Sequence, residues 1–242
     1  MKKLLQVLAR PFGYDFHKIN VNSKSINAIL NLVKKYKLND IVIFDVGAHE
    51  GQSIREFKKI FKNTKIYAFE PFPESYNNIL SFSSDQVKVF PIGLSDVEGK
   101  LKFFSNKGSA TNSLLRLSGM AKEGWGNIEA LSASSSVFCQ FSTLDDFVVE
   151  NGIDRIDVLK IDVQGAEFRV IEGGQKTLSS GMVKIVKCEI IQAETYVGQW
   201  PLVRYLERFD RLGFNLFNVC DCVYGNDGSL LQADFVFYFR DL

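Results

Sequence analysis

Short apolar runs alternate with amphipathic stretches between residues 40 and 191. The runs are rich in branched and aromatic residues and are apolar on both faces, which is typical of parallel strands covered by helices on both sides. They lie at residues 40–46, 65–70, 86–92, 156–162 and 183–190. The intervening residues 52–62 and 166–178 carry apolar side chains at helical spacing, and Gly173 and Gly174 interrupt the second stretch. This alternation predicts a doubly wound α/β sheet.

The pattern changes after residue 200. Residues 201–214 predict an amphipathic helix closed by Gly213, and apolar runs follow at residues 214–221 and 233–241. The link between these two runs is short and rich in Gly, Asn and Asp, so the two strands must run antiparallel. We therefore expect a parallel sheet with one antiparallel hairpin at an edge.

The middle of the chain departs from regular alternation. Residues 93–106 predict a turn and an extra strand, whereas residues 105–136, here called the flap segment, are rich in Ser, Gly and Asn and show little periodicity. A loop of this length inside a compact domain is usually functional, so we interpret it as a flap over the active site, with a plain surface insertion as the alternative. Regular structure resumes with a strand at residues 137–142 and a helix for which Thr143 can serve as N-cap.

No linker or repeat divides the chain, so we expect one domain over residues 40–242 and an N-terminal helical extension over residues 1–39. Leu4, Leu5 and Leu8 share one face of a short amphipathic helix. This helix would dock on the body of the protein or make a peripheral contact with a membrane surface. No stretch has the roughly 20 apolar residues that a transmembrane helix needs.

Composition narrows the classes of partner. The net charge is +1, which offers no electrostatic argument for nucleic acid. The four cysteines are scattered without the paired spacing of a zinc site, so we expect reduced thiols and a cytoplasmic location. Two of them, Cys220 and Cys222, are expected on one face of a strand because side chains alternate along a strand.

Polar residues gather where the predicted strands end. In open α/β sheets, ligands bind beyond the carboxyl ends of the strands. The residues at those ends are Asp45 with the loop 47–51, Glu70, the stretch 93–96, Asp162 and Glu189. Each position alone is a weak signal, but together they predict one site along a single edge of the sheet.

The glycine loop after the first strand discriminates between cofactors. A dinucleotide site needs G-x-G-x-x-G to cradle a pyrophosphate, whereas this loop reads G-A-H-E-G over residues 47–51, and the acid Glu50 would repel a pyrophosphate. Glu70, at the end of the next strand, is placed to accept hydrogen bonds from ribose hydroxyls. S-adenosylmethionine has a ribose and a sulfonium cation but no phosphate. The loop therefore favours the methyl donor over NAD, and an NAD-dependent oxidoreductase is the less favoured alternative.

Lys160 lies inside a strand that should be buried. A buried ammonium group is costly unless it is paired, and its expected partners are Asp162 on its own strand or Glu189 on a neighbouring strand. The pair would be either a structural ion pair or a catalytic aid. In both cases it would fix the orientation of Asp162 at the mouth of the cleft.

Six ordered stretches resemble one family. "FDVGAHEG", "YAFEPFPES", "GLSDVEG", "TLDDF", "LKIDVQGAE" and "KCEI" are similar to the FkbM family of S-adenosylmethionine-dependent methyltransferases, and the resemblance covers about residues 41–191. It implies a class I methyltransferase, a Rossmann-like three-layer sandwich whose seven-stranded sheet has an antiparallel last strand. It also implies O-methylation of a small-molecule or glycan acceptor, such as a hydroxyl of a sugar or a polyketide-type compound.

The resemblance implies roles for particular residues. The methionine end of the cofactor would meet Asp45, Gly47 and Gly51, the ribose would meet Glu70, and the adenine would lie near residues 93–95. The full expected cofactor site is Asp45, Gly47, Ala48, His49, Glu50, Gly51, Ser53, Glu70, Pro71, Gly93, Leu94, Ser95 and Asp162.

Candidate catalytic groups follow from the same loops. Asp162 is the first candidate for the base that removes the acceptor proton, His49 is the second and Glu167 is the third, while Lys160 would assist Asp162. The family often has Asn in place of His49 and Glu in place of Gln164. These departures leave open a catalytically silent cofactor-binding module. We expect no metal, because such a site would need Asp162, Glu167 and Glu189 to converge, with no histidine beside them.

Overall fold

The computed structural model describes residues 24–121, 125–126 and 129–241. The predicted peripheral helix with Leu4, Leu5 and Leu8 lies outside these residues. The described helices include none that is long and apolar enough to span a membrane.

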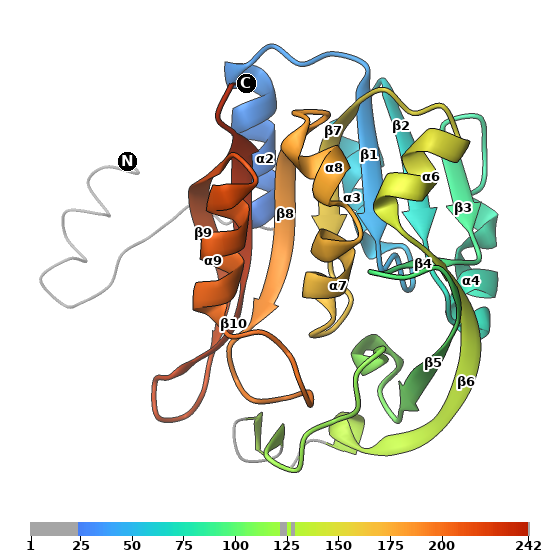
Figure 1. Ribbon diagram of the computed structural model, residues 1–242, viewed down its shortest axis with the longest axis vertical. Helices are drawn as coiled ribbons and strands as arrows, with labels where there is room; N and C mark the ends of the chain where they lie inside the picture. Colours follow the sequence, from blue (N-terminus) through green and yellow to red (C-terminus); the bar gives the residue numbers. More distant parts are fainter. Residues whose placement is uncertain (1–23, 122–124, 127–128, 242) are drawn as a thin grey trace, which may run out of the picture.

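A seven-stranded sheet forms the centre of the described structure, with strand order β3-β2-β1-β7-β8-β10-β9 (Figure 1). Its strands are β1 (Ile41–Val46), β2 (Thr64–Phe69), β3 (Val87–Phe90), β7 (Ile156–Ile161), β8 (Val183–Ile191), β9 (Phe214–Tyr224) and β10 (Leu230–Phe239). β10 runs antiparallel to both of its neighbours, β8 and β9. The other neighbouring strands of this sheet pair in parallel. This confirms the predicted parallel sheet with an antiparallel hairpin at an edge. β2 and β3 follow β1 on one side of it, and the chain later crosses to β7 on its other side, which makes the β1–β7 junction the switch point of the sheet.

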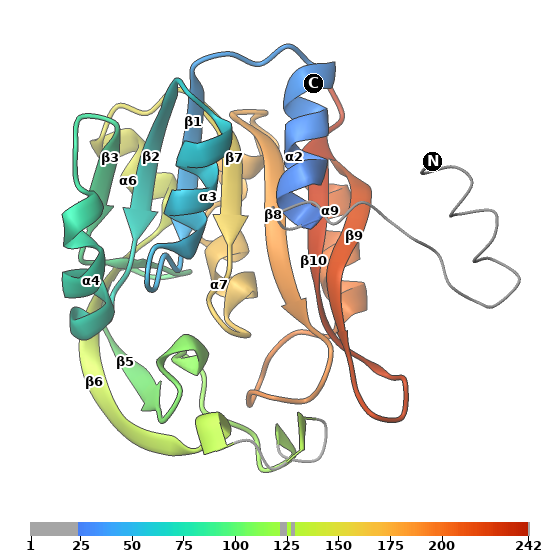
Figure 2. The ribbon, with the colours of Figure 1, turned by 180° about the vertical axis from the view of Figure 1, so that it is seen from behind.

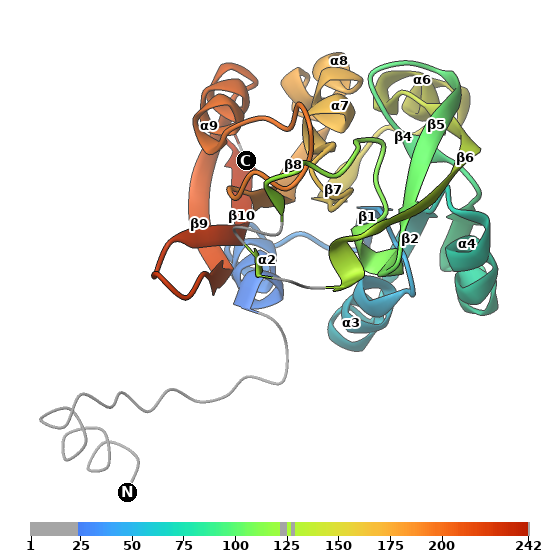
Figure 3. The ribbon, with the colours of Figure 1, turned by 90° about the horizontal axis from the view of Figure 1, so that it is seen from below.

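Helices cover both faces of this sheet, giving three layers (Figures 1–3). One face carries α6 (Leu144–Glu150), α7 (Glu167–Glu172), α8 (Gln175–Ser179) and α9 (Leu202–Arg211). The other face carries α2 (Lys24–Lys35), α3 (Gln52–Ile60) and α4 (Pro73–Ile79). A short 3-10 turn, η2 (Leu80–Phe82), follows α4. Each face has its own apolar core: Phe44 and Phe147 lie in the first and Ile43 and Phe57 in the second. Strands that are apolar on both faces fit this arrangement because both faces are buried.

Helix α2 is part of the second core. Ile26, Ile29 and Leu32 are almost fully buried in the same cluster as residues of the sheet. The start of α2 is held by Asp221 of β9, whose carboxylate accepts hydrogen bonds from the backbone N–H groups of Lys24 (3.1 Å) and Ser25 (2.9 Å). The domain therefore includes residues before the expected start at residue 40.

A smaller three-stranded sheet forms an arm beyond the carboxyl ends of the central strands (Figure 1). It consists of β4 (Gly93–Leu94), β5 (Gly99–Asn106) and β6 (Ala133–Ser142), with β6 between the other two. Strand β6 begins before the predicted residue 137, because Ser135 and Ser136 pair with β5 through their backbones. An apolar pattern cannot reveal such a polar strand segment. Two 3-10 turns, η3 (Ser109–Thr111) and η4 (Glu129–Leu131), lie within the flap segment.

The predicted break in the 166–178 helix is present. Gly173 separates α7 from α8, and a Cβ atom there would lie 2.0 Å from the carbonyl oxygen of Ser95. Only glycine allows this close approach of two backbones.

The expectation that Cys220 and Cys222 share a face is wrong. Cys220 packs in the core on the α2 side, whereas Cys222 packs against the opposite core. The cause is a bulge in β9, where Asp221 adopts a left-handed backbone (φ 49°) and the register with β10 shifts between Gln232 and Asp234. An extra residue of this kind reverses the alternation that follows it. All four cysteines are free thiols.

The N-cap of α6 yields a stability prediction. The Thr143 hydroxyl accepts a hydrogen bond from the backbone N–H of Asp146 at 3.0 Å. Thr143→Ala should lower the free energy of unfolding by about 1 kcal/mol in urea denaturation, because this N–H loses its partner. Thr143→Ser retains a hydroxyl and should lose less; equal losses in the two variants would contradict the capping role.

Candidate functional site

A cavity of about 610 Å³ lies at the carboxyl ends of the central strands, at the switch point between β1 and β7. Residues from the loops after β1, β2, β7 and β8 border it on one side. The flap segment borders it on the other side, through residues 109–112, Leu114, Trp125 and residues 130–131. Each predicted strand-end position contributes at least one residue to this cavity, and its contributors from the stretch 93–96, Gly93 and Leu94, form the short strand β4.

The loop from β1 to α3 is held tightly against its neighbours. The backbone N–H groups of Gly47 and Ala48 both donate to the carbonyl oxygen of Phe69, each at 3.1 Å. Gly47 has a φ of +82°, and a Cβ there would lie 1.9 Å from the carbonyl oxygen of Asp162. The first glycine is therefore required by contact with the β7 loop as well as by its backbone conformation.

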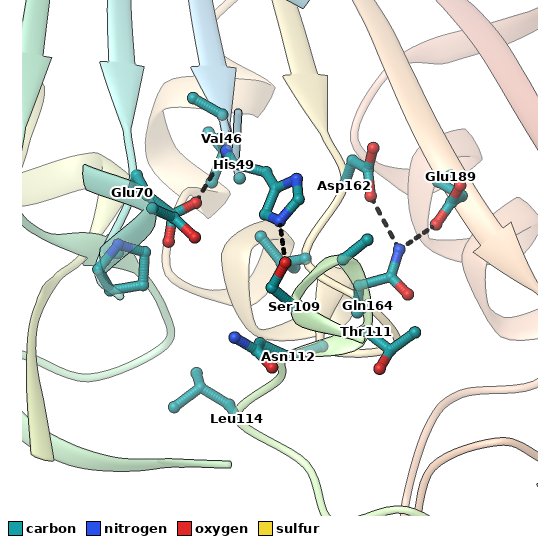
Figure 4. Close-up of a pocket in the computed structure, with 18 of the residues that line it drawn as sticks. Val46, His49, Glu70, Ser109, Thr111, Asn112, Leu114, Asp162, Gln164 and Glu189 are labelled. Carbon is teal, nitrogen blue, oxygen red and sulfur yellow. Dashed lines mark hydrogen bonds between the residues drawn. The ribbon is translucent and has the colours of Figure 1, made fainter. Parts of the chain in front are cut away.

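Glu70 is a buried acid on the cavity wall. Its two carboxylate oxygens accept hydrogen bonds from the backbone N–H groups of His49 and Phe72, each at 2.9 Å (Figure 4). Burial raises the pKa of Glu70 to about 7, although these two hydrogen bonds act in the opposite direction. Glu70 thus links the end of β2 to the glycine loop and changes charge near neutral pH.

Lys160 is paired as expected, but its closest carboxylate was not predicted. Its ammonium lies 3.0 Å from Asp45 Oδ1 and 3.5 Å from Asp162 Oδ2, and it donates to the carbonyl oxygen of Gly47 at 2.9 Å. Burial alone would lower the pKa of Lys160, but the charges of Asp45 and Asp162 outweigh it and place the pKa above its ordinary value. The sequence did not identify Asp45 as the partner of Lys160, because it does not reveal that β1 lies beside β7, with Asp45 opposite Lys160.

Gln164 connects the two acids Asp162 and Glu189 at this edge of the sheet. Its side-chain amide donates to Asp162 Oδ1 at 3.1 Å and to Glu189 Oε2 at 2.7 Å (Figure 4). Burial opposes the ionised form of Asp162, yet Lys160 and this amide hold its pKa below the ordinary value. Gln164 has a left-handed backbone (φ 57°), and the Ser113 hydroxyl donates to its carbonyl oxygen at 2.7 Å.

The flap segment and the loop 192–200 meet across the cavity. His49 Nε2 and Ser109 Oγ lie 2.9 Å apart (Figure 4). Tyr196 donates its hydroxyl to the carbonyl oxygen of Thr111 at 2.9 Å. Trp125 donates to the Thr195 hydroxyl at 2.7 Å. These contacts connect the flap segment to the glycine loop on one side and to the loop after β8 on the other.

Three expected cofactor-binding residues do not border the cavity. Asp45 is fully buried below the loop, where its carboxylate faces Lys160 and the Ser53 hydroxyl. Gly51 lies at the start of α3 with Phe82 against its backbone. Ser95 is also fully buried, and its hydroxyl donates to Asp96. The other expected residues do border it: Gly47, Ala48, His49, Glu50, Ser53, Glu70, Pro71, Gly93, Leu94 and Asp162.

Glu167 is not placed to act as a base in the cavity. It is fully buried behind the loop after β7, where its Oε1 accepts hydrogen bonds from the backbone N–H groups of Val163 (3.0 Å) and Gly165 (3.1 Å). Burial raises its pKa to about 7. In the part of the chain that the structure describes, no group of three His, Cys, Asp or Glu side chains could hold a metal ion.

Several cavity residues gave no signal in the sequence. Gln232 and Trp125 border the cavity but come from segments without a recognisable motif. Lys187 also borders it and begins the stretch "KCEI", but the sequence assigned it no role. Two aromatic side chains of the loop 192–200 are packed against the rest of the protein. Tyr196 borders the cavity but is 1% exposed, and Trp200 stacks on Phe168 with ring centroids 5.3 Å apart.

The chemistry of the cavity wall fits S-adenosylmethionine better than a dinucleotide. Both lysines that border the cavity are paired: Lys160 with Asp45 as described above, and Lys187 with Asp234 at 2.8 Å. Among the described residues, the cavity therefore has no unpaired lysine or arginine that could bind a pyrophosphate. Carboxylates from Glu50, Glu56, Glu70, Asp162 and Glu189 surround the space instead. Such a wall suits a cationic ligand, and apolar atoms of Pro71, Leu94 and Phe141 offer a surface for an adenine ring.

Comparison with known sequences decides the family. The model of the methyltransferase FkbM domain matches residues 45–216, which is more than half of the chain. The chain belongs to the FkbM methyltransferase family. It is therefore a methyltransferase, and S-adenosylmethionine is the cofactor of this family.

Three curated proteins are similar to this FkbM methyltransferase. The 2-O-methyltransferase NoeI of Sinorhizobium fredii is 28% identical over 84% of each chain. The methyltransferase sdnD of Sordaria araneosa is 31% identical, over 54% of this chain and 59% of that protein. The AMB antimetabolite synthetase AmbE of Pseudomonas aeruginosa is 32% identical over 55% of this chain, which corresponds to only 8% of that protein.

The buried lysine yields a stability prediction. Lys160→Met removes the only cation within ion-pair distance of Asp45 in the described structure, leaving a buried carboxylate without its charge partner. We expect a loss of about 3–5 kcal/mol in the free energy of unfolding, measured by chemical denaturation. The double variant Asp45→Asn/Lys160→Met should recover part of this loss. A double variant no more stable than Lys160→Met would contradict the ion-pair explanation.

Glu70 yields a prediction for pH dependence. A carboxylate accepts hydrogen bonds from ribose hydroxyls better than a carboxylic acid does, and the pKa of Glu70 is raised to about 7. The affinity for S-adenosylhomocysteine should therefore rise as the pH rises through 7 and level off above it, as measured by calorimetry. Glu70→Gln should weaken binding and flatten this rise. An equally steep rise in the variant would assign it to another group.

Proposed function

We propose that this chain is an O-methyltransferase that transfers a methyl group from S-adenosylmethionine to a hydroxyl of a sugar, a glycan or a related natural product. The observation that carries the proposal is the pair of carboxylates Asp162 and Glu189, which Gln164 joins at the cavity wall next to the glycine loop. Carboxylates in this position can accept hydrogen bonds from hydroxyl groups of an acceptor. The similarity to a protein described as a 2-O-methyltransferase supports oxygen as the methylated atom.

In this proposal the glycine loop, Glu70 and the apolar surface around Leu94 hold the cofactor, which supplies the activated methyl group. The protein must then mainly align the acceptor oxygen, and alignment of two reactants can lower a barrier by about 7–11 kcal/mol. Asp162 provides this alignment, because Lys160 fixes one oxygen of its carboxylate and Gln164 fixes the other. Because its pKa is lowered, Asp162 is a weak base and acts by orienting the hydroxyl.

His49 has a positioning role. Its backbone N–H holds Glu70 at 2.9 Å, and its imidazole contacts Ser109 of the flap segment at 2.9 Å. The residue expected as the second candidate base therefore connects the cofactor loop to the flap segment that shapes the acceptor side of the cavity. Lys160 assists Asp162 by holding it at the cavity wall.

Label transfer tests the proposed function. The protein is incubated with methyl-labelled S-adenosylmethionine and a panel of methyl glycosides, free oligosaccharides and lipid-linked sugars, and label in the acceptor is measured by mass shift. We expect transfer to a hydroxyl of at least one class. A protein that binds S-adenosylmethionine but labels no acceptor would support a silent binding module, and binding of NAD alone would support an oxidoreductase.

Asp162→Asn tests the orienting role. The variant retains the shape of the side chain but loses its charge, so turnover should fall by about 10²-fold or more. The affinity for S-adenosylhomocysteine should change little, as measured by calorimetry. The exposed Glu150→Gln on α6 serves as a control with unchanged turnover. Loss of cofactor affinity in Asp162→Asn would make Asp162 a binding residue instead.

A further inference from the structure

Glu189 borders the cavity, and the proposed function gives it no part in the reaction beyond accepting a hydrogen bond from the acceptor. It follows Cys188 at the end of the β7–β8 pairing, and Asp162 follows Ile161, the residue opposite Cys188. The two acids thus lie on adjacent parallel strands at the same edge of the sheet, and both border the cavity (Figure 4). Two acids in equivalent positions invite comparison of their partners.

The two acids differ in how their charge is stabilised. Asp162 has an ammonium group 3.5 Å away, that of Lys160. Glu189 instead accepts hydrogen bonds from two neutral amides, from Gln164 Nε2 to Oε2 at 2.7 Å and from Gln232 Nε2 to Oε1 at 3.2 Å. Within the described ranges it forms no ion pair with a lysine, arginine or histidine. The amides fix the position of the carboxyl group but supply no positive charge.

The surroundings of Glu189 disfavour its ionised form. Besides burial, the negative charges that act on it are those of Asp162 after β7, Glu167 from α7 and Asp234 from β10, while the ammonium groups of Lys187 from β8 and Lys160 from β7 act in the opposite direction. Together they raise the pKa of Glu189 well above its ordinary value. A carboxylate whose pKa is raised is the stronger base, so Glu189 suits proton removal better than Asp162, whose pKa is lowered.

We propose that Glu189 takes the proton of the acceptor hydroxyl, and that the positive charge of the bound methyl donor prepares it by favouring its ionised form. The identity of the reaction rests on the function proposed above. As the hydroxyl oxygen forms its bond to the methyl carbon, the carbon–sulfur bond breaks and its electron pair stays on sulfur. The O–H proton passes to the Glu189 carboxylate and later to solvent. Because the single proton of the reacting hydroxyl goes to Glu189, Asp162 orients the acceptor during this step through another of its hydroxyl groups.

The preparation of Glu189 can be measured without knowing the acceptor. S-adenosylmethionine carries a sulfonium cation, whereas S-adenosylhomocysteine has a neutral thioether in the same place. A nearby positive charge lowers the pKa of a carboxyl group, so binding of the cationic ligand should release a proton from Glu189 and binding of the neutral ligand should not. Both ligands have the same ribose, so a proton that ribose binding releases from Glu70 is counted equally for both. It cancels in the difference between the two proton releases.

Calorimetry in buffers with different ionisation enthalpies gives the number of protons released on binding. Measured between about pH 6 and pH 9, S-adenosylmethionine should release more protons than S-adenosylhomocysteine, with an excess of up to about one proton. The excess should disappear at any pH at which Glu189 is already ionised before the ligand binds. Equal release by the two ligands at every pH would overturn the proposal.

Three variants assign the excess to one residue. Glu189→Gln should abolish it, whereas Glu56→Gln, at an acid that borders the same cavity from α3, should retain it. An excess that persists in Glu189→Gln would belong to another group and overturn the proposal. If Glu189→Gln fails to fold, Gln232→Met serves as the second variant, because it removes one hydrogen bond from the Glu189 carboxylate. In this variant the excess proton release should move to higher pH. An unchanged pH range would also overturn the proposal. Binding of neither ligand by the folded wild-type protein would instead contradict the proposed function.

Discussion

The buried ammonium group of Lys160 is the contact on which the rest of the site depends. It lies between Asp45 of β1 and Asp162 after β7, and it also binds the carbonyl oxygen of Gly47 in the glycine loop. Two strands and two loops are therefore fixed by one charge at the switch point of the sheet. A buried ion pair is weak evidence for stability by itself, because desolvation offsets much of the attraction. Its value here is geometric, since the same cation determines where the cofactor loop and the orienting acid lie.

The acceptor side of the cavity is assembled from distant parts of the chain. Ser109 meets His49, Ser113 holds the backbone of Gln164, and Tyr196 reaches Thr111. Most of these contacts are hydrogen bonds between hydroxyl groups and backbone carbonyl oxygens. Such hydrogen bonds can be replaced by others between the same loops with little change in the packing of the core. In the proposed function two roles are thereby separated, since the sheet edge would hold the cofactor and the acids, while irregular loops would shape the space for the acceptor.

The sequence predicted the regular parts of the fold and most of the strand-end residues that border the cavity. Apolar periodicity was sufficient for the central strands and for the break at Gly173, because burial on both faces of a sheet leaves a pattern along the chain. It could not predict contacts that depend on strand order, such as Asp45 with Lys160, or bulges such as that at Asp221. Nor could it show that Glu167 turns away from the cavity, because the direction of a loop side chain depends on which backbone N–H groups it finds. Motif-free residues such as Gln232 enter the site only through the three-dimensional arrangement.

The docking of α2 has a consequence for synthesis on the ribosome. The backbone N–H of Lys24 is bound by a residue that follows it by 197 positions, and the apolar face of α2 lies against strands of the same late hairpin. At a translation rate of about 5–20 residues per second, the nascent helix waits roughly 10–40 s before its partner strands exist. During that time Ile26, Ile29 and Leu32 lack the surface that β9 and β10 provide. This interval is the one in which a nascent-chain chaperone would gain most by binding this protein.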